Sequence, residues 1–366
     1  MLFLGSLSIA FALALAFTNG SNDVSKGIAT LVGSGVASFR RAVLWGAGWT
    51  VAGGAVAALA AQGLVATFSG KGFLDPPIGG SSFLAAVAAG AVGWVAFASL
   101  TGLPVSTTHA IAGALAGAGL VAQGARHLHW ALFAAKIVVP LALSPLLAIA
   151  LIQVVLPVLR RPMAKVEAYC LCIERRVAVA SVGVLAMTTE TRPLLGNGEA
   201  CAVSPAIAAR LSLVDALHWL SAALTSFARG LNDAPKIVAL GIAAAVGFGV
   251  PSLPFYCAVA VGMGAGSVVA GFRVTRTLAQ KITSMSPAEG FAANAVTTLL
   301  VGLASSAALP VSTTHVSAGA VIGLGIHRDA GGVRWHTVRE LLLAWLVTLP
   351  AAALLGGGAF VLMARA

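Results

Sequence analysis

The chain has 366 residues, of which 59% are hydrophobic and only 9% are charged. Soluble domains carry roughly 25% charged residues, so this composition excludes a soluble globular protein and predicts an integral membrane protein. The formal net charge is +11, but the basic residues lie at the ends of apolar stretches, which favours a role in membrane topology over nucleic-acid binding. We therefore expect the lipid bilayer, and no nucleic acid, as a partner.

Apolar stretches long enough to cross a membrane as helices recur from end to end. In the first half they cover about 2–19, 24–38, 42–67, 82–101, 107–123 and 130–157. In the second half, after a polar and basic segment, they cover about 211–229, 234–249, 253–272, 291–309, 313–327 and 337–363. The pattern predicts an all-α polytopic membrane protein with about 10–12 membrane segments.

Two motifs occur once in each half of the chain. The sequence Leu-Pro-Val-Ser-Thr-Thr-His covers Leu103–His109 and again Leu309–His315, at an offset of 206 residues. An Asn-Asp pair followed by a lysine covers Asn22–Lys26 and again Asn232–Lys236, at an offset of 210 residues. The near-constant offset predicts one fold unit that is repeated.

The repeat divides the chain into three parts. We predict a first transmembrane repeat at 1–158, a basic cytoplasmic linker at 159–210 and a second, inverted transmembrane repeat at 211–366. An odd number of crossings in each repeat inverts the second copy, and inverted repeats are a common plan of secondary transporters. Most basic residues then lie on one side, which the positive-inside rule makes cytoplasmic. Both termini are expected outside, in a plasma (inner) membrane.

The first stretch of each repeat is too long for one straight span. Residues 2–38 would form about 55 Å of helix at a rise of about 1.5 Å per residue. We therefore expect a broken or re-entrant helix, interrupted at the Asn-Asp motif in both repeats.

The Asn-Asp motifs place acidic groups inside apolar sequence. Carboxylates are costly there and usually functional, which applies to Asp23 and Asp233. Together with Asn22 and Asn232 they would supply oxygens for a coupling cation, as broken helices do in transporters. The alternative is that each aspartate pairs with its own lysine and only stabilises the helix break.

Lys26 and Lys236 leave the coupling ion open. An ammonium beside an aspartate can take the place of a sodium ion, or it can pair with an anionic substrate as a point charge. We therefore expect coupling to Na⁺ or H⁺, with no metal other than sodium and no other cofactor.

The repeated Leu-Pro-Val-Ser-Thr-Thr-His motif predicts the start of a helix inside the membrane. The proline breaks the preceding segment, and the serine is a natural N-cap. A helix that begins there presents free backbone N–H groups and the positive end of its dipole, which suit a tetrahedral oxyanion. We expect anion contacts from the hydroxyls and from three nearby basic side chains: Ser106, Thr107, Thr108, Ser312, Thr313, Thr314, Lys26, Lys236 and Arg229. The alternative is an ordinary capped helix in each repeat.

Three further residues stand out near these motifs. His109 and His315 fit three roles: ligand, proton carrier or structural anchor. Arg229 has no counterpart in the first repeat, where Asn19 holds the equivalent place. We expect Arg229 either to bind an oxyanion or to form an ion pair with Asp233. The sequence shows no nucleophile elbow, P-loop or metal-spaced His/Cys cluster, so we expect no enzyme and assign no catalytic residue.

The motifs also resemble the signatures of a known family. Gly20–Val24 is similar to the Gly-Ala-Asn-Asp-Val signature of the PiT family of inorganic phosphate transporters, and Gly33–Val36 follows it at the usual distance. Pro-Val-Ser-Thr-Thr-His is the second signature of that family, in both halves. The resemblance covers everything except the linker. It implies an inverted-repeat transporter, usually a homodimer, that binds phosphate between its halves near the middle of the membrane.

The chain departs from the family pattern at four positions. Thr50 and Asn294 stand where family members carry glutamates, and Lys26 and Lys236 stand where the family usually has asparagine. Loss of carboxylates suits sulfate, which has no proton to donate, and weakens the case for sodium. We therefore predict a secondary active phosphate transporter that works by alternating access, with a sulfate permease as the alternative. An anion channel and, more remotely, a membrane scaffold or receptor also stay open.

Overall fold

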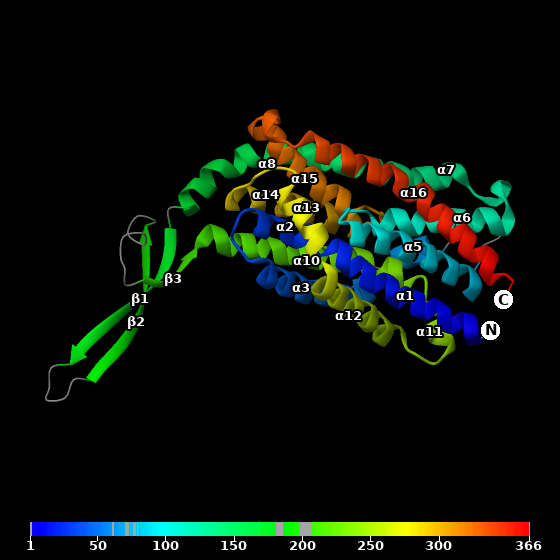
Figure 1. Ribbon diagram of the computed structural model, residues 1–366, viewed down its shortest axis with the longest axis horizontal. Helices are drawn as coiled ribbons and strands as arrows, with labels where there is room; N and C mark the ends of the chain where they lie inside the picture. The colour runs from blue at the N-terminus through cyan, green and yellow to red at the C-terminus, as the bar shows by residue number, and fades with distance from the viewer. Residues whose placement is uncertain are drawn as a thin grey trace.

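The computed structural model describes residues 2–60, 62–69, 73–75, 78, 80–167, 169–180, 186–197 and 207–365. The helices form an elongated bundle, with both chain termini at one end and the linker at the other (Figure 1). Within the described chain, seven helices are long and apolar enough to cross a membrane by length and composition. The predicted helical polytopic membrane fold is confirmed.

The long apolar helices of the first half of the bundle are α1, α3, α5 and α8. Its helices are α1 (Leu2–Asp23), α2 (Ser25–Gly33), α3 (Phe39–Ala60), α4 (Gln62–Phe68), α5 (Ser81–Thr101), α6 (Thr107–Gln123), α7 (Trp130–Phe133) and α8 (Val139–Glu167). A π-helical turn, Ala134–Val138, joins α7 to α8.

The second half follows the linker in the same order of long and short helices. Its helices are α10 (Leu213–Val238), α11 (Ile242–Gly247), α12 (Ser252–Ala270), α13 (Phe272–Gln280), α14 (Pro287–Ser306), α15 (Thr313–Arg328) and α16 (Trp335–Met363).

Three helices of more than 15 residues lie outside the seven apolar spans in the described chain. The helices that follow the repeated motif, α6 and α15, have only 17 and 16 residues, because each begins midway through the bundle. Helix α10 has 26 residues but includes the charged side chains of the second Asn-Asp motif. Seven spans and these three helices make ten segments, which lies within the predicted range.

The first Asn-Asp motif lies at the end of α1, separated from α2 by Val24, which keeps helical angles of φ −55° and ψ −32°, whereas the second lies within α10. Helix α1 ends at Asp23, and α2 begins after Val24 alone. In contrast, α10 runs through the second motif to Val238, so the predicted break at Asn232-Asp233 is wrong. The lysines also differ in their acceptors: Lys26 bonds to a backbone carbonyl of α1, whereas Lys236 bonds to a carbonyl outside α10.

The linker contains strands that the all-α prediction did not include. Helix α8 continues past Arg160 to Glu167, and three antiparallel strands follow, β1 (Tyr169–Ala180), β2 (Ala186–Asn197) and β3 (Ile207–Ser212). Their order in the sheet is β2-β1-β3. The β1–β2 hairpin extends away from the helical bundle (Figure 1).

The two halves interlock instead of lying side by side. Helix α1 packs on α12, and α3 packs on α10. Each half therefore covers the helix of the other half that carries an Asn-Asp motif. Glycines permit the close approach: a Cβ at Gly20 would lie 1.9 Å from the Met263 carbonyl oxygen, and one at Gly230 would lie 2.3 Å from the Thr50 carbonyl oxygen. Small residues at such crossings let helix backbones touch in membranes. The Asn-Asp motifs, two residues further along, are thereby held at the centre.

The helices that follow the two copies of Leu-Pro-Val-Ser-Thr-Thr-His are α6 and α15, which we call the motif helices. They point in opposite directions. In Figure 1, α6 begins near the middle of the bundle and runs toward the end with the termini, while α15 begins near the middle and runs toward the linker. The N-termini of both helices therefore meet in the interior.

Candidate anion-binding site

Both motif serines are N-caps, as predicted. Ser106 has an extended backbone, with φ −93° and ψ 116°, and its Oγ accepts a hydrogen bond from the His109 backbone N–H at 3.2 Å. Ser312 does the same for the His315 backbone N–H at 3.1 Å. The backbone N–H groups of each first turn are thus fixed at the centre of the bundle.

The two motifs are hydrogen-bonded to each other. Thr108 donates its hydroxyl to the Val311 carbonyl at 3.3 Å, and Thr314 donates its hydroxyl to the Val105 carbonyl at 2.8 Å. Each second threonine therefore reaches the residue before the serine of the other motif. This reciprocal pair brings together residues that lie more than 200 positions apart, at separations of 203 and 209.

The Asn-Asp motif of α1 contacts the first copy of Leu-Pro-Val-Ser-Thr-Thr-His. We call the two copies of this sequence the anion motifs. Asn22 donates to the Leu103 carbonyl at 2.9 Å and accepts from the Val105 backbone N–H at 3.2 Å. Asp23 accepts a hydrogen bond from the Thr107 hydroxyl at 3.3 Å. The pair thus binds the turn that precedes α6 as well as the first residue of α6.

The second Asn-Asp motif contacts the turn before α15 and the end of α14. Asn232 donates to the Val311 carbonyl at 3.3 Å and accepts from the Ser305 hydroxyl at 3.2 Å. In the first half, the Ser99 hydroxyl contacts the Asn22 amide at 3.3 Å. Ser99 and Ser305 were not singled out from the sequence, although their offset of 206 residues equals that of the repeated motif.

Both lysines point at the aspartate three residues earlier. The Lys26 Nζ lies 2.6 Å from the Asp23 carboxylate, and the Lys236 Nζ lies 3.2 Å from the Asp233 carboxylate. Lys236 also donates to the Thr108 hydroxyl at 2.7 Å. The two buried ion pairs therefore adjoin the anion motifs.

Asn19 and Arg229 occupy equivalent places in the repeats and meet at the centre. The Asn19 amide donates to Asp23 at 3.0 Å, to Thr107 at 3.0 Å and to Asp233 at 3.3 Å, so it bridges the two carboxylates. Arg229 donates to the side-chain amide oxygen (Oδ1) of Asn19 at 3.5 Å. Sequence reasoning noted Asn19 only as the counterpart of Arg229 and missed its bridging position.

Arg229 is held by neutral groups. Its other terminal nitrogen donates to the Thr50 hydroxyl at 2.6 Å, and its Nε has no hydrogen-bond partner among the described residues. The structure places no carboxylate within ion-pair distance of it in the described chain, which disagrees with the expected ion pair to Asp233. Thr50 thus contacts the site. Asn294 bonds instead to Ser221 at 3.4 Å.

The centre carries an excess of positive charge. Asp23, Asp233, Lys26, Lys236 and Arg229 are each at most 2% exposed. Three basic and two acidic side chains leave a formal charge of +1 among these five. A buried net charge is costly unless it is compensated, so this arrangement favours an anion.

The residues expected to bind the anion are all buried beside this cluster. None is more than 3% exposed, which applies to Ser106, Thr107, Thr108, Ser312, Thr313 and Thr314. The conformation is therefore closed to solvent at the centre.

The rings of the two motif histidines lie against each other, tilted by 38°. Their ring centroids are 4.6 Å apart, and the His315 ring stacks on Trp345 at 4.0 Å. A His315 ring nitrogen lies 3.1 Å from the Leu141 carbonyl oxygen. Both rings line a cavity of about 380 Å³ with apolar residues of α8 and α16. The stack joins α6, α15 and α16.

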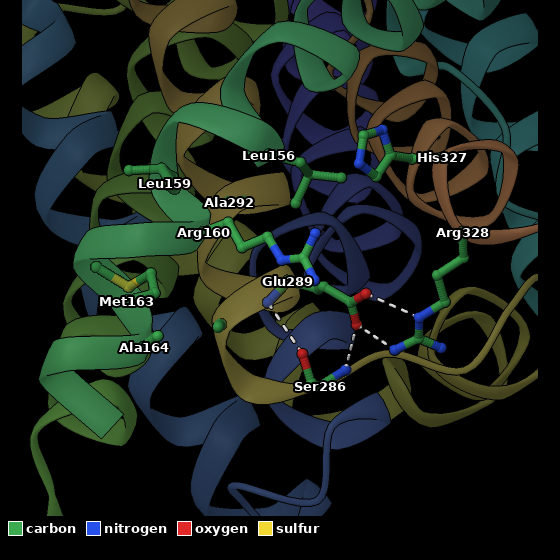
Figure 2. A pocket seen from close by; sticks show the side chains of 11 residues that line it. Leu156, Leu159, Arg160, Met163, Ala164, Ser286, Glu289, Ala292, His327 and Arg328 are labelled. Atoms are coloured by element: carbon green, nitrogen blue, oxygen red, sulfur yellow. Dashed lines mark hydrogen bonds and ion pairs between the residues drawn. The ribbon is translucent and has the colours of Figure 1, made fainter. Parts of the chain in front are cut away.

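A larger cavity lies at the linker end, away from the anion motifs. Figure 2 shows this space of about 570 Å³ between α8, α14 and α15, with Arg160, Glu289 and Arg328 among its lining side chains. Glu289 accepts the Arg328 Nε–H at 2.8 Å and the Ser286 backbone N–H at 2.7 Å. This ion pair ties the start of α14 to the end of α15.

The chain is similar to known transporters over nearly its whole length. It matches the phosphate transporter family over residues 19–356. It is 30% identical to a probable low-affinity inorganic phosphate transporter of Rhizobium meliloti (strain 1021), which covers 95% of this chain and 92% of that protein. A protein of the same description from Bacillus subtilis (strain 168) is 28% identical, with coverages of 99% and 98%.

A solved structure shares the fold. It is described as the sodium-dependent phosphate transporter and superimposes with a TM-score of 0.77 at 20% identity, over 99% of both chains. At this identity the likeness concerns the fold alone. The match across both repeats, the two motifs and the shared architecture lead to one conclusion: the chain belongs to the phosphate transporter family.

Proposed function

We propose that this protein moves inorganic phosphate across the membrane by alternating access, as a secondary active transporter driven by a Na⁺ or H⁺ gradient. The observation that carries the proposal is the formal charge of +1 among five buried side chains at the meeting point of two helix N-termini. Helix N-termini bind phosphate-like anions through free N–H groups and the helix dipole. The names of the relatives support phosphate as the anion.

The residues divide into two groups in this proposal. Arg229 and the serine and threonine residues of both motifs bind the anion, while the Asn-Asp pairs hold a coupling cation or the lysines. The histidine stack anchors the motif helices or carries a proton. Since the site is closed on both sides, transport requires one end of the bundle to open at a time.

The proposal includes the surroundings of the protein. We place it as a homodimer in the plasma membrane, with the linker in the cytoplasm and both termini outside. Transport without covalent chemistry is sufficient for this site, so no enzymatic activity is proposed.

Uptake into proteoliposomes tests the function. Purified protein is reconstituted, and radiolabelled phosphate is supplied under a proton gradient, a sodium gradient or neither. We expect phosphate to accumulate above its external concentration under at least one cation gradient, and unlabelled phosphate to compete more strongly than sulfate. The double variant Thr107→Ala with Thr313→Ala should lose most of the uptake, while Thr101→Ala, at the exposed end of α5, should not.

Each alternative has its own result in the same assay. Stronger competition by sulfate identifies a sulfate permease, and uptake that stops at equal concentrations under every gradient identifies an anion channel. If neither anion enters the vesicles, the transport proposal is rejected.

A further inference from the structure

We propose that Lys26 and Lys236 are tethered cations that fill the two cation sites beside the Asn-Asp motifs, so that the protein moves its anion without sodium. This inference rests on the proposed transport function and chooses between the coupling ions left open there. It is carried by the oxygen atoms around the two ammonium groups.

Lys26 is surrounded by oxygens of its own helix break. Its Nζ lies 2.6 Å from Asp23 Oδ1 and 2.9 Å from both the backbone carbonyl oxygen and Oδ1 of Asn22. Asn22 lies in the last turn of α1, and its backbone carbonyl oxygen also accepts the Ser25 hydroxyl at 2.8 Å. A carboxylate, an amide oxygen and a carbonyl at a helix end are the ligands that hard cations take in proteins.

Lys236 is surrounded by oxygens from three elements. Its Nζ lies 2.7 Å from the Thr108 hydroxyl, 3.1 Å from the Val311 carbonyl oxygen and 3.2 Å from Asp233 Oδ1. These groups come from the first motif helix, the turn before α15, and α10. The three acceptors are again a carboxylate, a backbone carbonyl and a neutral oxygen, here a hydroxyl. Together they form a cation site that the ammonium group fills.

The lysines have no donors left for other partners. An ammonium has three N–H donors, and each lysine has three oxygen acceptors within reach. Both residues are 1% exposed. A sodium ion could reach these oxygens only if the ammonium group left its buried position. The ammonium groups therefore supply fixed positive charge near the anion without contacting it directly.

A tethered cation differs from a bound ion in what it contributes to transport. Sodium that binds on one side and leaves on the other brings the energy of its gradient. A lysine remains with the protein, so it neutralises charge and carries no gradient energy. In this protein, accumulation of the anion must then be driven by protons, and in their absence transport only equalises concentrations.

Sodium binding by purified protein tests the inference without reference to transport. Binding of ²²Na⁺ and the thermal stability in sodium chloride are compared with those in choline chloride at equal ionic strength. We expect no sodium binding and no sodium-dependent shift for the unchanged protein. Lys26→Asn and Lys236→Asn, which remove the ammonium and add an amide oxygen, should each bind ²²Na⁺ several-fold above the background of the assay.

Two controls make the comparison specific. Lys26→Met removes the same charge without adding an oxygen and should gain less sodium binding than Lys26→Asn. Lys165→Asn, at the exposed end of α8, should gain none. If one asparagine variant does not fold, sodium binding by the other variant tests the inference. If neither folds, sodium binding by the unchanged protein tests it.

The outcomes separate the inference from the proposed function. Sodium binding by the unchanged protein, or folded asparagine variants that gain none, overturns the inference. In proteoliposomes, phosphate uptake driven by protons and unaffected by replacing sodium with choline supports it, while uptake driven by sodium overturns it. Absence of anion uptake under every gradient rejects the transport function and leaves the sodium-binding result to stand by itself.

Discussion

Arg229 shows how one side chain determines the charge of the site. Its guanidinium is 1% exposed, and its hydrogen bonds go to the neutral groups of Thr50 and Asn19. Hydrogen bonds that involve a charged group contribute about 1.5–3 kcal/mol. An oxyanion beside the free Nε would supply the compensation that neutral groups cannot.

We predict that Arg229→Gln weakens phosphate binding. Loss of one charged hydrogen bond should raise the KM of phosphate uptake by about ten-fold or more, since about 1.4 kcal/mol corresponds to a factor of ten. The measurement is uptake against phosphate concentration, with Arg339→Gln on the exposed face of α16 as the control. An unchanged KM together with reduced thermal stability would assign Arg229 a purely structural role.

The sequence predicted individual residues better than it predicted their partners. The serine caps follow from local geometry, because the N-cap bond joins residues three positions apart. The reciprocal bonds of Thr108 and Thr314 were not predictable in this way, because each partner lies on the other repeat. Asn19 was missed for the same reason, since its role depends on where α10 places Asp233.

At the scale of helices, repeated sequence does not guarantee repeated backbone. Both Asn-Asp motifs have a lysine at the same spacing, yet only α1 ends at its motif. The acceptors of the two lysines differ in the same way: Lys26 donates to a carbonyl of α1, and Lys236 donates to the carbonyl of Val311. The sequence could locate the motif but not the helix end, because that end depends on contacts with a distant turn.

Helix crossings near the motifs depend on glycine, and α3 allows a matched test. A Cβ at Gly53 would lie 2.1 Å from the Phe227 carbonyl oxygen of α10, whereas a Cβ at Gly48 would meet nothing within 4 Å. We predict that Gly53→Ala lowers the melting temperature and abolishes uptake, because α3 must move away from α10. Gly48→Ala on the same helix should leave both unchanged, measured by thermal unfolding in detergent and by uptake. Equal behaviour of the two variants would contradict the close packing.

The whole molecule separates its termini from its linker along the long axis. Both termini lie at one end of the bundle in Figure 1, and the linker lies at the other. Arg40 and Arg41 open α3, and Arg160 lies in the part of α8 that leads into the linker. The helical polytopic character of the bundle followed from the sequence. The strands of the linker did not, since apolar periodicity reports on the bundle alone.

We predict that the linker end faces the cytoplasm, following the positive-inside rule. In a background without native cysteines, Arg365→Cys should react with a membrane-impermeant thiol reagent added to intact cells. Lys165→Cys should react only after the membrane is permeabilised. The reverse labelling pattern would invert the proposed orientation.

The interlocked packing also constrains how the chain enters the membrane during synthesis. The packing partners of α1 and α3 are α12 and α10, which are synthesised later. The glycine-containing surfaces of the first half are therefore exposed to lipid until the second half is inserted. Asp23 can already pair with Lys26 at that stage, because both lie within one turn of the nascent chain. The costliest charge of the early segment is thus neutralised before the other half exists. Lys236 acquires its full set of acceptors only when the turn before α15 arrives, which makes completion of the site one of the last events of assembly.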